Sequence, residues 1–413
     1  MDLSPERRLL LACARANLVA EDRRRISELA AGHLDWDQIA AVAYTHGVAP
    51  LIYRSLAHSG AICLVPSKTA QTLERAYYGN AASNLHLYSE LRKVLVSLRQ
   101  RKVETIVLKG AALAEMVYPH STLRPMSDVD ILVRKNNVAE AEATLMNMGY
   151  RVDADAKQQR LKEHYHLVFT KPGHTNIELH WHVKRPSGPF RIDIDALWQR
   201  CQPVKIAGID ALLFSPEDLL LYLCQHFWKH EFTGGIRPLC DIAEVIKHYG
   251  EKIDWKKAAA RSSEWEMNPC TYVGLRLASN LLDAAIPERR LEDLRPVDLK
   301  NEVISWAMES VLGHGECPLV FPELLKLFWK GHSVKERWSV LQGLFSQRTV
   351  AEHGNDTFAS NRAYVYYPSR IKHLLIEHGP TVRRLWVGEQ KIRAAAETAE
   401  KQQRLAKWLS EYH

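Results

Sequence analysis

One stretch, IVLKGAALAEMVYPHSTLRPMSDVDILV at residues 106–133, constrains what this chain can fold into more than any other. An apolar run precedes a Lys-Gly pair, small residues follow it, and a second apolar run begins with two aspartates. This order predicts two strands joined by a tight turn and a short helix. The expected elements are a buried strand over 103–108, a turn at Lys109-Gly110, a helix over 111–118 and a strand entered through Ser127 and Asp128.

Two carboxylates share one face of that second strand. Side chains alternate along a strand, so Asp128 and Asp130 point the same way, while Val129 and Ile131 point into the core. Two carboxylates side by side need a compensating charge. A divalent cation such as Mg²⁺ is the expected partner, and Mg²⁺ in proteins is usually bound together with phosphates.

The next eighty or so residues extend the same unit. NNVAEAEATLMNMGY (residues 136–150) has the spacing of an amphipathic helix that ends at a glycine. YHLVFTKPGHTNIELHWHV (residues 165–183) has two alternating runs around a Lys-Pro-Gly-His turn, which predicts a hairpin. The order strand, helix, strand, helix, strand, strand indicates an α/β or α+β core with a mixed sheet.

Helical patterns lie on both sides of this core. Residues up to 101 predict an N-terminal helical cap, and Ser215-Pro216-Glu217-Asp218 opens a mostly helical C-terminal region. A polar loop is expected over 345–368, followed over 381–413 by a basic helix that is solvated or, less favoured, contacts a membrane surface or nucleic acid. The expected domains are 1–101 (helical), 102–212 (catalytic core), 213–345 (helical, substrate side) and 346–413 (loop and tail).

Composition places the chain in an ordinary class. The 413 residues carry a formal net charge of +7, which is compatible with an anionic partner without requiring one. The seven cysteines are scattered singly, so neither a disulfide framework nor a zinc module is expected, and a cytoplasmic location without a transmembrane segment fits best. No dense stripe of Arg and Lys with interleaved aromatic residues appears, which disfavours a nucleic-acid partner.

The acidic strand, the Lys109-Gly110 turn and a third acidic residue, Glu178 in NIELH, together resemble the nucleotidyltransferase superfamily related to DNA polymerase β. VLKGAAL, LRPMSDVDILV, IELHWHV and LFSPEDLLLYLCQH resemble more narrowly a large bacterial branch of that superfamily, over roughly residues 30–250. The resemblance implies a nucleotidyltransferase core that takes a nucleoside triphosphate, such as ATP, as donor.

The resemblance also implies roles for individual residues. Asp128, Asp130 and Glu178 would hold two Mg²⁺ ions, or Mn²⁺, and serve catalysis. Gly110 would let the backbone approach the triphosphate at a helix N-terminus. Many members have Gly-Ser at this turn, whereas here Lys109 precedes the glycine and would supply a positive charge instead. Further contacts with the phosphates are expected from Ser127 and Arg124, which flank the acidic strand; for Arg124 an exposed loop position is the open alternative.

Three histidines are candidates for the acceptor side of the site. His180 and His182 share the strand face of Glu178, and His226 is followed one helical turn later by His230. Packing or substrate contact is favoured for the H-x-H pair over zinc, since no third nitrogen or sulfur ligand is evident nearby. For His226, an ordinary helix surface or a core position is the stronger alternative.

The sequence therefore predicts a Mg²⁺-dependent nucleotidyltransferase that transfers a nucleoside monophosphate to a hydroxyl and releases pyrophosphate. The acceptor is left open among a small molecule, a protein side chain and an RNA terminus. A catalytically silent nucleotide-binding or scaffold protein with the same fold is the alternative. It is disfavoured because neighbouring like charges destabilise a fold that binds no metal.

Overall fold

The computed structural model describes residues 3–152, 165–230, 232–297 and 299–313, together with residues 401, 404, 405, 407 and 408. The described residues up to 313 belong to one compact unit. The expected loop over 345–368 and nearly all of the expected tail helix lie outside the described residues. The predicted domain boundaries stay a prediction.

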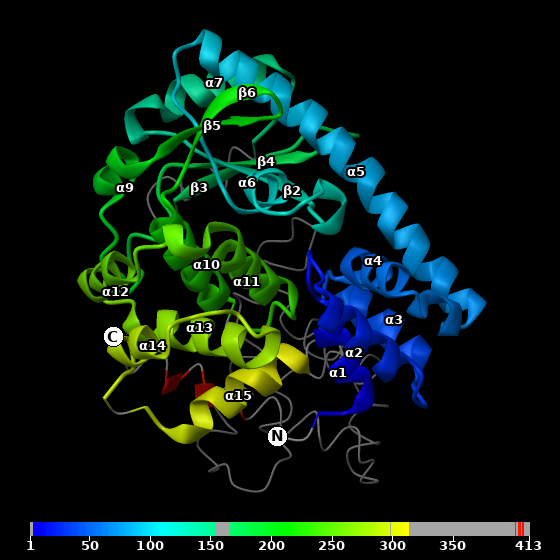
Figure 1. The fold of residues 1–413 in the computed structure, drawn as a ribbon. Coiled ribbons are helices and arrows are strands. Elements are labelled where there is room, and N and C mark those ends of the chain that lie inside the picture. Colours follow the sequence, from blue (N-terminus) through cyan, green and yellow to red (C-terminus); the bar gives the residue numbers. More distant parts are fainter. Residues whose placement is uncertain are drawn as a thin grey trace, which may run out of the picture. The chain divides into compact units, whose positions relative to one another are not determined.

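The described strands form a mixed six-stranded sheet in the order β3-β4-β2-β1-β6-β5 (Figure 1). β2 and β4 are parallel, as are β1 and β6, and the other neighbours are antiparallel. The mixed sheet predicted from the sequence is thus confirmed. The strands are β1 Ile106–Val107, β2 Asp128–Leu132, β3 His166–Phe169, β4 Asn176–His180, β5 Gln202–Ile206 and β6 Ile209–Leu213.

Two hairpins contribute to the sheet, and the sequence predicted one of them. The β3–β4 hairpin turns at Gly173, whose φ of 75° suits glycine. The β5–β6 hairpin was not expected. Its two turn residues, Ala207 and Gly208, have φ values of 50° and 72°, a left-handed pair typical of a two-residue hairpin.

Helices cover the sheet and form the N-terminal region, as predicted. The long helix α5 (Ser67–Gln100) runs from the N-terminal helices to the sheet (Figure 1). Its second half buries five leucine and valine side chains in the core of the sheet: Leu87, Leu91, Val94, Leu95 and Leu98. The other helices up to the second hairpin are α1 Pro5–Cys13, α2 Ala20–Ala30, α3 Trp36–Thr45, α4 Ala49–Ser59, α6 Lys109–Met116, α7 Val138–Asn147 and α9 Ile194–Arg200.

α5 also braces the segment that leads into the acidic strand. The side-chain amide of Asn84 donates to the backbone carbonyl oxygens of Ser121 and Arg124, at 2.7 and 3.0 Å. The hydroxyl of Tyr88 donates to the carbonyl oxygen of Ala111 at 2.7 Å. The position of β2 therefore depends on a helix that begins in the N-terminal region.

The C-terminal part of the described chain is helical, as predicted. Ser215 caps the first of these helices by accepting the N–H of Asp218. No helix within the described ranges combines the length and apolar character needed to cross a membrane. The helices are α10 Pro216–Lys229, α11 Arg237–Tyr249, α12 Trp255–Glu264, α13 Asn268–Leu282, α14 Glu288–Asp293 and α15 Asn301–Leu312.

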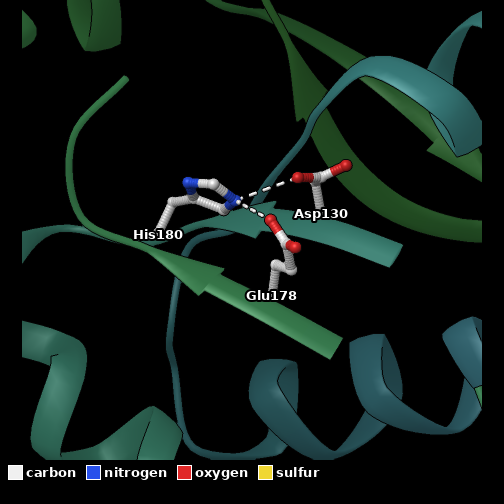
Figure 2. A group of neighbouring side chains, drawn as sticks. All are labelled: Asp130, Glu178 and His180. Atoms are coloured by element: carbon white, nitrogen blue, oxygen red, sulfur yellow. Dashed lines mark hydrogen bonds and ion pairs between the residues drawn. The ribbon is translucent and has the colours of Figure 1, made fainter. Parts of the chain in front are cut away.

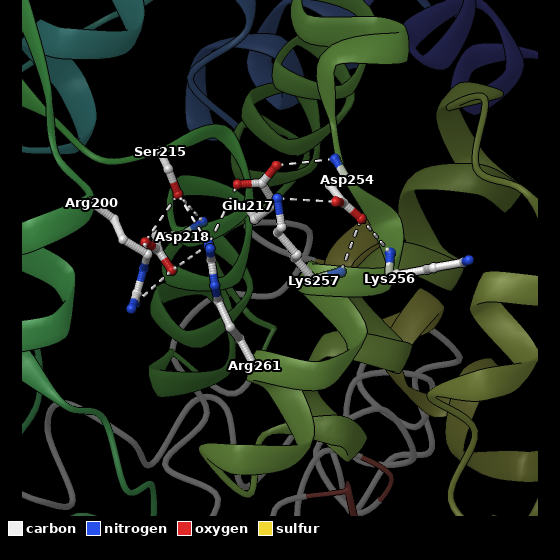
Figure 3. Close-up of polar contacts among 8 residues, drawn as sticks. All are labelled: Arg200, Ser215, Glu217, Asp218, Asp254, Lys256, Lys257 and Arg261. Carbon is white, nitrogen blue, oxygen red and sulfur yellow. Dashed lines mark hydrogen bonds and ion pairs between the residues drawn. The ribbon is translucent and has the colours of Figure 1, made fainter.

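A buried ionic network joins the helices α9, α10 and α12 (Figure 3). The Asp218 side chain on α10 is fully buried. It accepts hydrogen bonds from Arg200 of α9 at 2.7 and 3.1 Å and from Arg261 of α12 at 3.0 Å. Neighbouring Glu217 accepts the backbone N–H of Asp254, the N-cap residue of α12. The SPED motif therefore does more than start a helix, because it fixes how α9, α10 and α12 pack.

Candidate active site

The parallel pairing of β2 with β4 brings the acidic residues together. Asp130 pairs in register with Glu178, and Asp128 pairs with Asn176. Alternate side chains share one face of a strand, so the three carboxylates project from the same side of the sheet. Residues next to them along the two strands are fully buried in the core: Val129, Ile131 and Ile177. The structure thus brings together the three acidic residues that the sequence singled out.

Asp130 is the centre of this group. It is 4 % exposed, and its Oδ1 atom lies 2.7 Å from Nζ of Lys109 and 2.9 Å from Nε2 of His180. The same His180 nitrogen lies 3.3 Å from Oε2 of Glu178, as Figure 2 shows. Lys109 approaches from the β1 side of β2 and His180 from the β4 side.

The surroundings shift the pKa values of this group in opposite directions. Burial alone would raise the pKa of Asp130, but Lys109 and His180 outweigh it and hold that pKa well below its usual range. Burial opposes the charge of Lys109, yet Tyr222 and the carboxylates of Asp130 and Glu178 raise its pKa. The pKa of Asp128 is raised by burial and by those same two carboxylates. Asp128 is therefore short of positive charge.

The turn before the site differs from the expected one. Leu108 is extended (φ −100°, ψ 163°), and α6 begins at Lys109, earlier than predicted. Lys109 has a φ of 37°, a left-handed conformation that a side chain other than glycine adopts at a cost of about 1–2 kcal/mol. This backbone carries the Lys109 ammonium to Asp130. The preceding strand β1 is also shorter than expected, since only Ile106 and Val107 of the predicted residues 103–108 form it.

Gly110 has a packing role as well. A Cβ atom there would lie 2.9 Å from Nη1 of Arg124 and 3.3 Å from Sδ of Met126. Contacts under 3.0 Å force a shift, so a side chain at this position would displace the Arg124 guanidinium. The role of Gly110 at the phosphates remains a prediction.

Arg124 lies in a buried ion pair. It is 7 % exposed, and its Nε and Nη2 atoms donate to the two carboxylate oxygens of Asp241 at 2.8 and 2.7 Å. The Tyr118 hydroxyl donates to the same carboxylate at 2.9 Å. This ion pair connects the segment that precedes β2 to α11. Nη1 faces Gly110, and the phosphate contact expected of Arg124 stays a prediction.

The remaining predicted residues take different positions. The Ser127 hydroxyl donates to Asp128 at 3.2 Å. His182 Nδ1 accepts the backbone N–H groups of Val183 and Lys184 at 2.9 and 3.2 Å, which leaves the ring proton on Nε2. His226 is half-buried, and its pKa is well below the usual value because of burial and then the charges of Lys109 and His230.

Three further residues border the site and were not singled out from the sequence. The His166 ring stacks on His180 at 4.9 Å between centroids, and the Tyr165 ring lies 5.7 Å from His180. The hairpin register pairs His166 with His180, so the predicted hairpin could have indicated this contact. Tyr222 lies one helical turn before His226, and its pKa is raised by burial.

The donor atoms fit a divalent cation. Among the described residues, Asp130, Glu178 and His180 each offer one ligand atom, and these atoms lie within 4.8 Å of one another. Two carboxylate oxygens suit Mg²⁺ or Mn²⁺, and an imidazole nitrogen is accepted more readily by Mn²⁺. Asp128 adds a further carboxylate, whose pKa is raised by burial and then by the charges of Asp130 and Glu178. His182 lies outside the group, so the structure does not assemble the H-x-H pair as a zinc site.

Two solved structures show a distant similarity to this chain. A solution structure of the antibiotic-resistance factor ANT(2'')-Ia is 17 % identical, covers 43 % of this chain and 92 % of its own, and superposes with a TM-score of 0.31. A crystal structure of an antigenic nucleotidyltransferase-like protein from Paracoccidioides brasiliensis is 16 % identical, covers 49 % and 94 %, and has a TM-score of 0.28. Scores this low carry no argument about this chain. No curated protein matches the chain.

The family comparison is more informative. A family model described as "Uncharacterised nucleotidyltransferase" matches residues 32–283. This range is more than half of the 413-residue chain and contains the whole described sheet, the acidic group and the Arg124–Asp241 pair. The chain belongs to this nucleotidyltransferase family.

Proposed function

We propose that this protein is a Mg²⁺- or Mn²⁺-dependent enzyme that transfers a nucleoside monophosphate from a nucleoside triphosphate to a hydroxyl acceptor. The observation that carries the proposal is the register of β2 against β4, which sets Asp130 beside Glu178 on one face with Asp128 next along the strand. The carboxylates, which would hold the cations, lie next to the N-terminus of α6, and a helix N-terminus favours anionic phosphates.

The chain supplies the donor side through Lys109 and the start of α6. When bound, divalent cations would neutralise the phosphates and lower the pKa of the acceptor hydroxyl. Asp128, Asp130, Glu178 and His180 would hold them. Lys109, which pairs with Asp130 in this structure, would supply its positive charge to the triphosphate, as expected from the sequence. Ser127 and Arg124 stay candidates for contacts with the phosphates.

The reaction needs no covalent enzyme intermediate. The acceptor oxygen forms a bond to the α-phosphorus, and the bond from that phosphorus to the pyrophosphate oxygen breaks. The hydroxyl proton passes to Glu178, whose side chain is 23 % exposed and thus more accessible than Asp130. Without a cation, the Nε2 atom of His180 orients both carboxylates, and with one bound the same nitrogen would serve as a ligand instead.

One observation favours a catalytically silent scaffold as the second candidate. Lys109 and His180 already lie within hydrogen-bond distance of Oδ1 of Asp130, so this carboxylate is compensated without a metal. Such a protein would bind nucleotide and transfer nothing. Asp128 counts against this reading, since burial and then the carboxylates of Asp130 and Glu178 raise its pKa, and a bound cation would offset both effects.

Labelling experiments separate the two candidates. The protein is incubated with each of the four α-³²P-labelled nucleoside triphosphates, Mg²⁺ or Mn²⁺, and a total cell lysate, which is then fractionated into RNA, protein and small molecules. Asp130→Asn is the test variant. Asp210→Asn is the matched control, because Asp210 is exposed and pairs with Lys205 on the outer hairpin of the sheet.

The expected result is label in one fraction with the unmodified protein and with Asp210→Asn, and a loss of at least a hundredfold with Asp130→Asn. Metal-dependent nucleotide binding without label in any fraction would establish the scaffold instead. Equal labelling by Asp130→Asn would remove the acidic group from the mechanism.

A further inference from the structure

A cavity of about 660 Å³ is lined by residues that follow β2 and β4, and by Tyr165, whose ring lies 5.7 Å from that of His180. Its walls come from the segments that follow β2 and β4, with Arg134 and Lys135 on one side and Trp181, His182 and Lys184 on the other. Trp198 of α9 completes the wall, and the Arg134 guanidinium lies over its ring at 4.5 Å. The cavity therefore combines cations with large aromatic rings.

Lys184 is the cation that most requires a partner here. Its ammonium donates to three backbone carbonyl oxygens, of Arg185, Pro186 and Gly188, at 3.1 to 3.5 Å. No carboxylate pairs with it among the described residues, and burial lowers its pKa. Carbonyl dipoles compensate an ammonium less well than an anion does, so this position favours a negatively charged ligand.

A second cavity of about 370 Å³ continues from the first and repeats its chemistry. The two share Tyr165 and Lys184. The second adds the cations Arg185 and Lys229 and the rings of Phe190 and Trp228. Among the described lining residues of both cavities, five basic side chains face a single acidic one, Asp195. Two adjoining compartments thus each offer aromatic rings with positive charge.

The first cavity is connected to the acidic group through Tyr165. This residue lines the cavity, and its ring lies 5.7 Å from the ring of His180. His182, which also lines the cavity, follows two residues after His180, just beyond the end of β4. Lys109 and α6, proposed above to hold the donor triphosphate, lie on the β1 side of Asp130. A ligand in these cavities would reach Glu178 from the β4 side, which is the acceptor side.

Building on the proposed function, we propose that the paired cavities bind the last nucleotides of a single-stranded nucleic acid, whose terminal hydroxyl is the acceptor. Single strands are held by grooves that combine cations for the phosphates with aromatic side chains for the bases. One compartment would serve a single nucleotide, and two in succession fit a strand. The terminal hydroxyl would then enter the step written above, with pyrophosphate as the leaving group.

Binding is tested without triphosphate or divalent cation. Fluorescence anisotropy follows a labelled single-stranded RNA of about 12 nucleotides, its duplex, and AMP as competitor, over a range of salt concentrations. The test variant is Lys135→Gln/Lys184→Gln. Two substitutions, Lys256→Gln/Lys257→Gln on the exposed face of α12, change the net charge equally and serve as the control. Thermal unfolding confirms that all variants are folded.

We expect the single strand to bind at least tenfold more tightly than the duplex or AMP. The test variant should bind the strand at least tenfold more weakly. The slope of log K against log salt should become shallower by about 1.4, since each phosphate that a lysine no longer neutralises reduces it by about 0.7. The α12 control should match the unmodified protein. Equal weakening in the control, or AMP binding as tightly as the strand, would overturn the proposal.

The outcomes distinguish this inference from the proposed function. Label in the protein or small-molecule fraction, with no binding of the single strand, contradicts the strand proposal and agrees with nucleotidyl transfer. Specific strand binding with no label in any fraction supports the strand-binding role of the cavities and contradicts nucleotidyl transfer.

Discussion

The Nζ atom of Lys109 lies 2.7 Å from Oδ1 of Asp130, with both side chains largely buried. This pair leaves the acidic group compensated in the absence of a cation. It also sets up a competition, because the oxygen that holds Lys109 is one that a metal would take.

Replacing Lys109 by Met should therefore destabilise the metal-free protein most. Breaking a buried pair by removing one partner leaves an uncompensated charge and costs about 3–5 kcal/mol. Urea unfolding in EDTA should show this loss, and excess Mg²⁺ should recover part of it. Lys256→Met, on the surface of α12, should change neither measurement. An equal loss with and without Mg²⁺ would contradict the competition.

Divalent cations should stabilise the protein through the acidic group. A ligand that binds the folded state at a hundred times its Kd adds about 2.7 kcal/mol. Thermal unfolding should shift upward with Mn²⁺ and Mg²⁺, and Asp130→Asn should abolish both shifts. His180→Gln should reduce the shift with Mn²⁺ more than the shift with Mg²⁺, because an imidazole ligand suits Mn²⁺ better. A His180 variant that binds both ions as before would exclude it as a ligand.

The Arg124–Asp241 pair should be required for folding. Arg124→Met leaves a buried carboxylate and should lower the free energy of unfolding by about 3–5 kcal/mol. Arg124→Lys keeps the charge and loses the two-point contact, so it should recover only part of the loss. Gly110→Ala should lower the free energy of unfolding by a smaller amount, since its Cβ would lie 2.9 Å from Nη1 of the same guanidinium. Denaturant unfolding of the three variants tests this order.

Asp218 should matter more than a helix cap. Asp218→Asn removes the charge that holds Arg200 and Arg261, and we expect a loss of about 3–5 kcal/mol in urea unfolding. Asp193→Ala removes a surface cap of α9 and should cost less. If the two variants lose the same free energy of unfolding, the buried network in Figure 3 contributes no more to stability than an ordinary helix cap.

His226 should make the protein less stable in mild acid. Its folded pKa lies well below the usual 6.5, owing to burial and then to Lys109 and His230, while Asp130 opposes the shift. The unfolded chain therefore binds this proton more readily, and stability falls as the pH drops below about 6.5. His226→Gln should flatten that part of the stability curve. A folded pKa near 6.5 by NMR titration would refute the assignment.

The sequence predicted the site better than its surroundings. Asp128, Asp130 and Glu178 follow from strand alternation and from one hairpin, and both are local patterns. Lys109 was expected to face phosphates, but its partner Asp130 depends on the left-handed backbone at the start of α6. Alternating runs flank Ala207-Gly208, yet the β5–β6 hairpin was missed because alanine rarely supports such a turn.

The cavities show why the partner was harder to predict. The sequence contains no stripe of basic and aromatic residues, which disfavoured nucleic acid. The structure gathers Arg134, Trp181, Lys184, Trp198 and Trp228 from separate segments into adjoining walls. No spacing rule along the chain reports a wall assembled from several elements.

The helix α5 has a consequence for how the chain is made. During synthesis its residues emerge before every strand of the sheet, so the leucine and valine face that later enters the core has nothing to cover it. The sheet cannot close around β1 until β6, its parallel neighbour, has also emerged. More than a hundred further residues must therefore be synthesised before the apolar face of α5 can be buried against the complete sheet. The order of synthesis therefore leaves this apolar face uncovered by the sheet until β6 has been made.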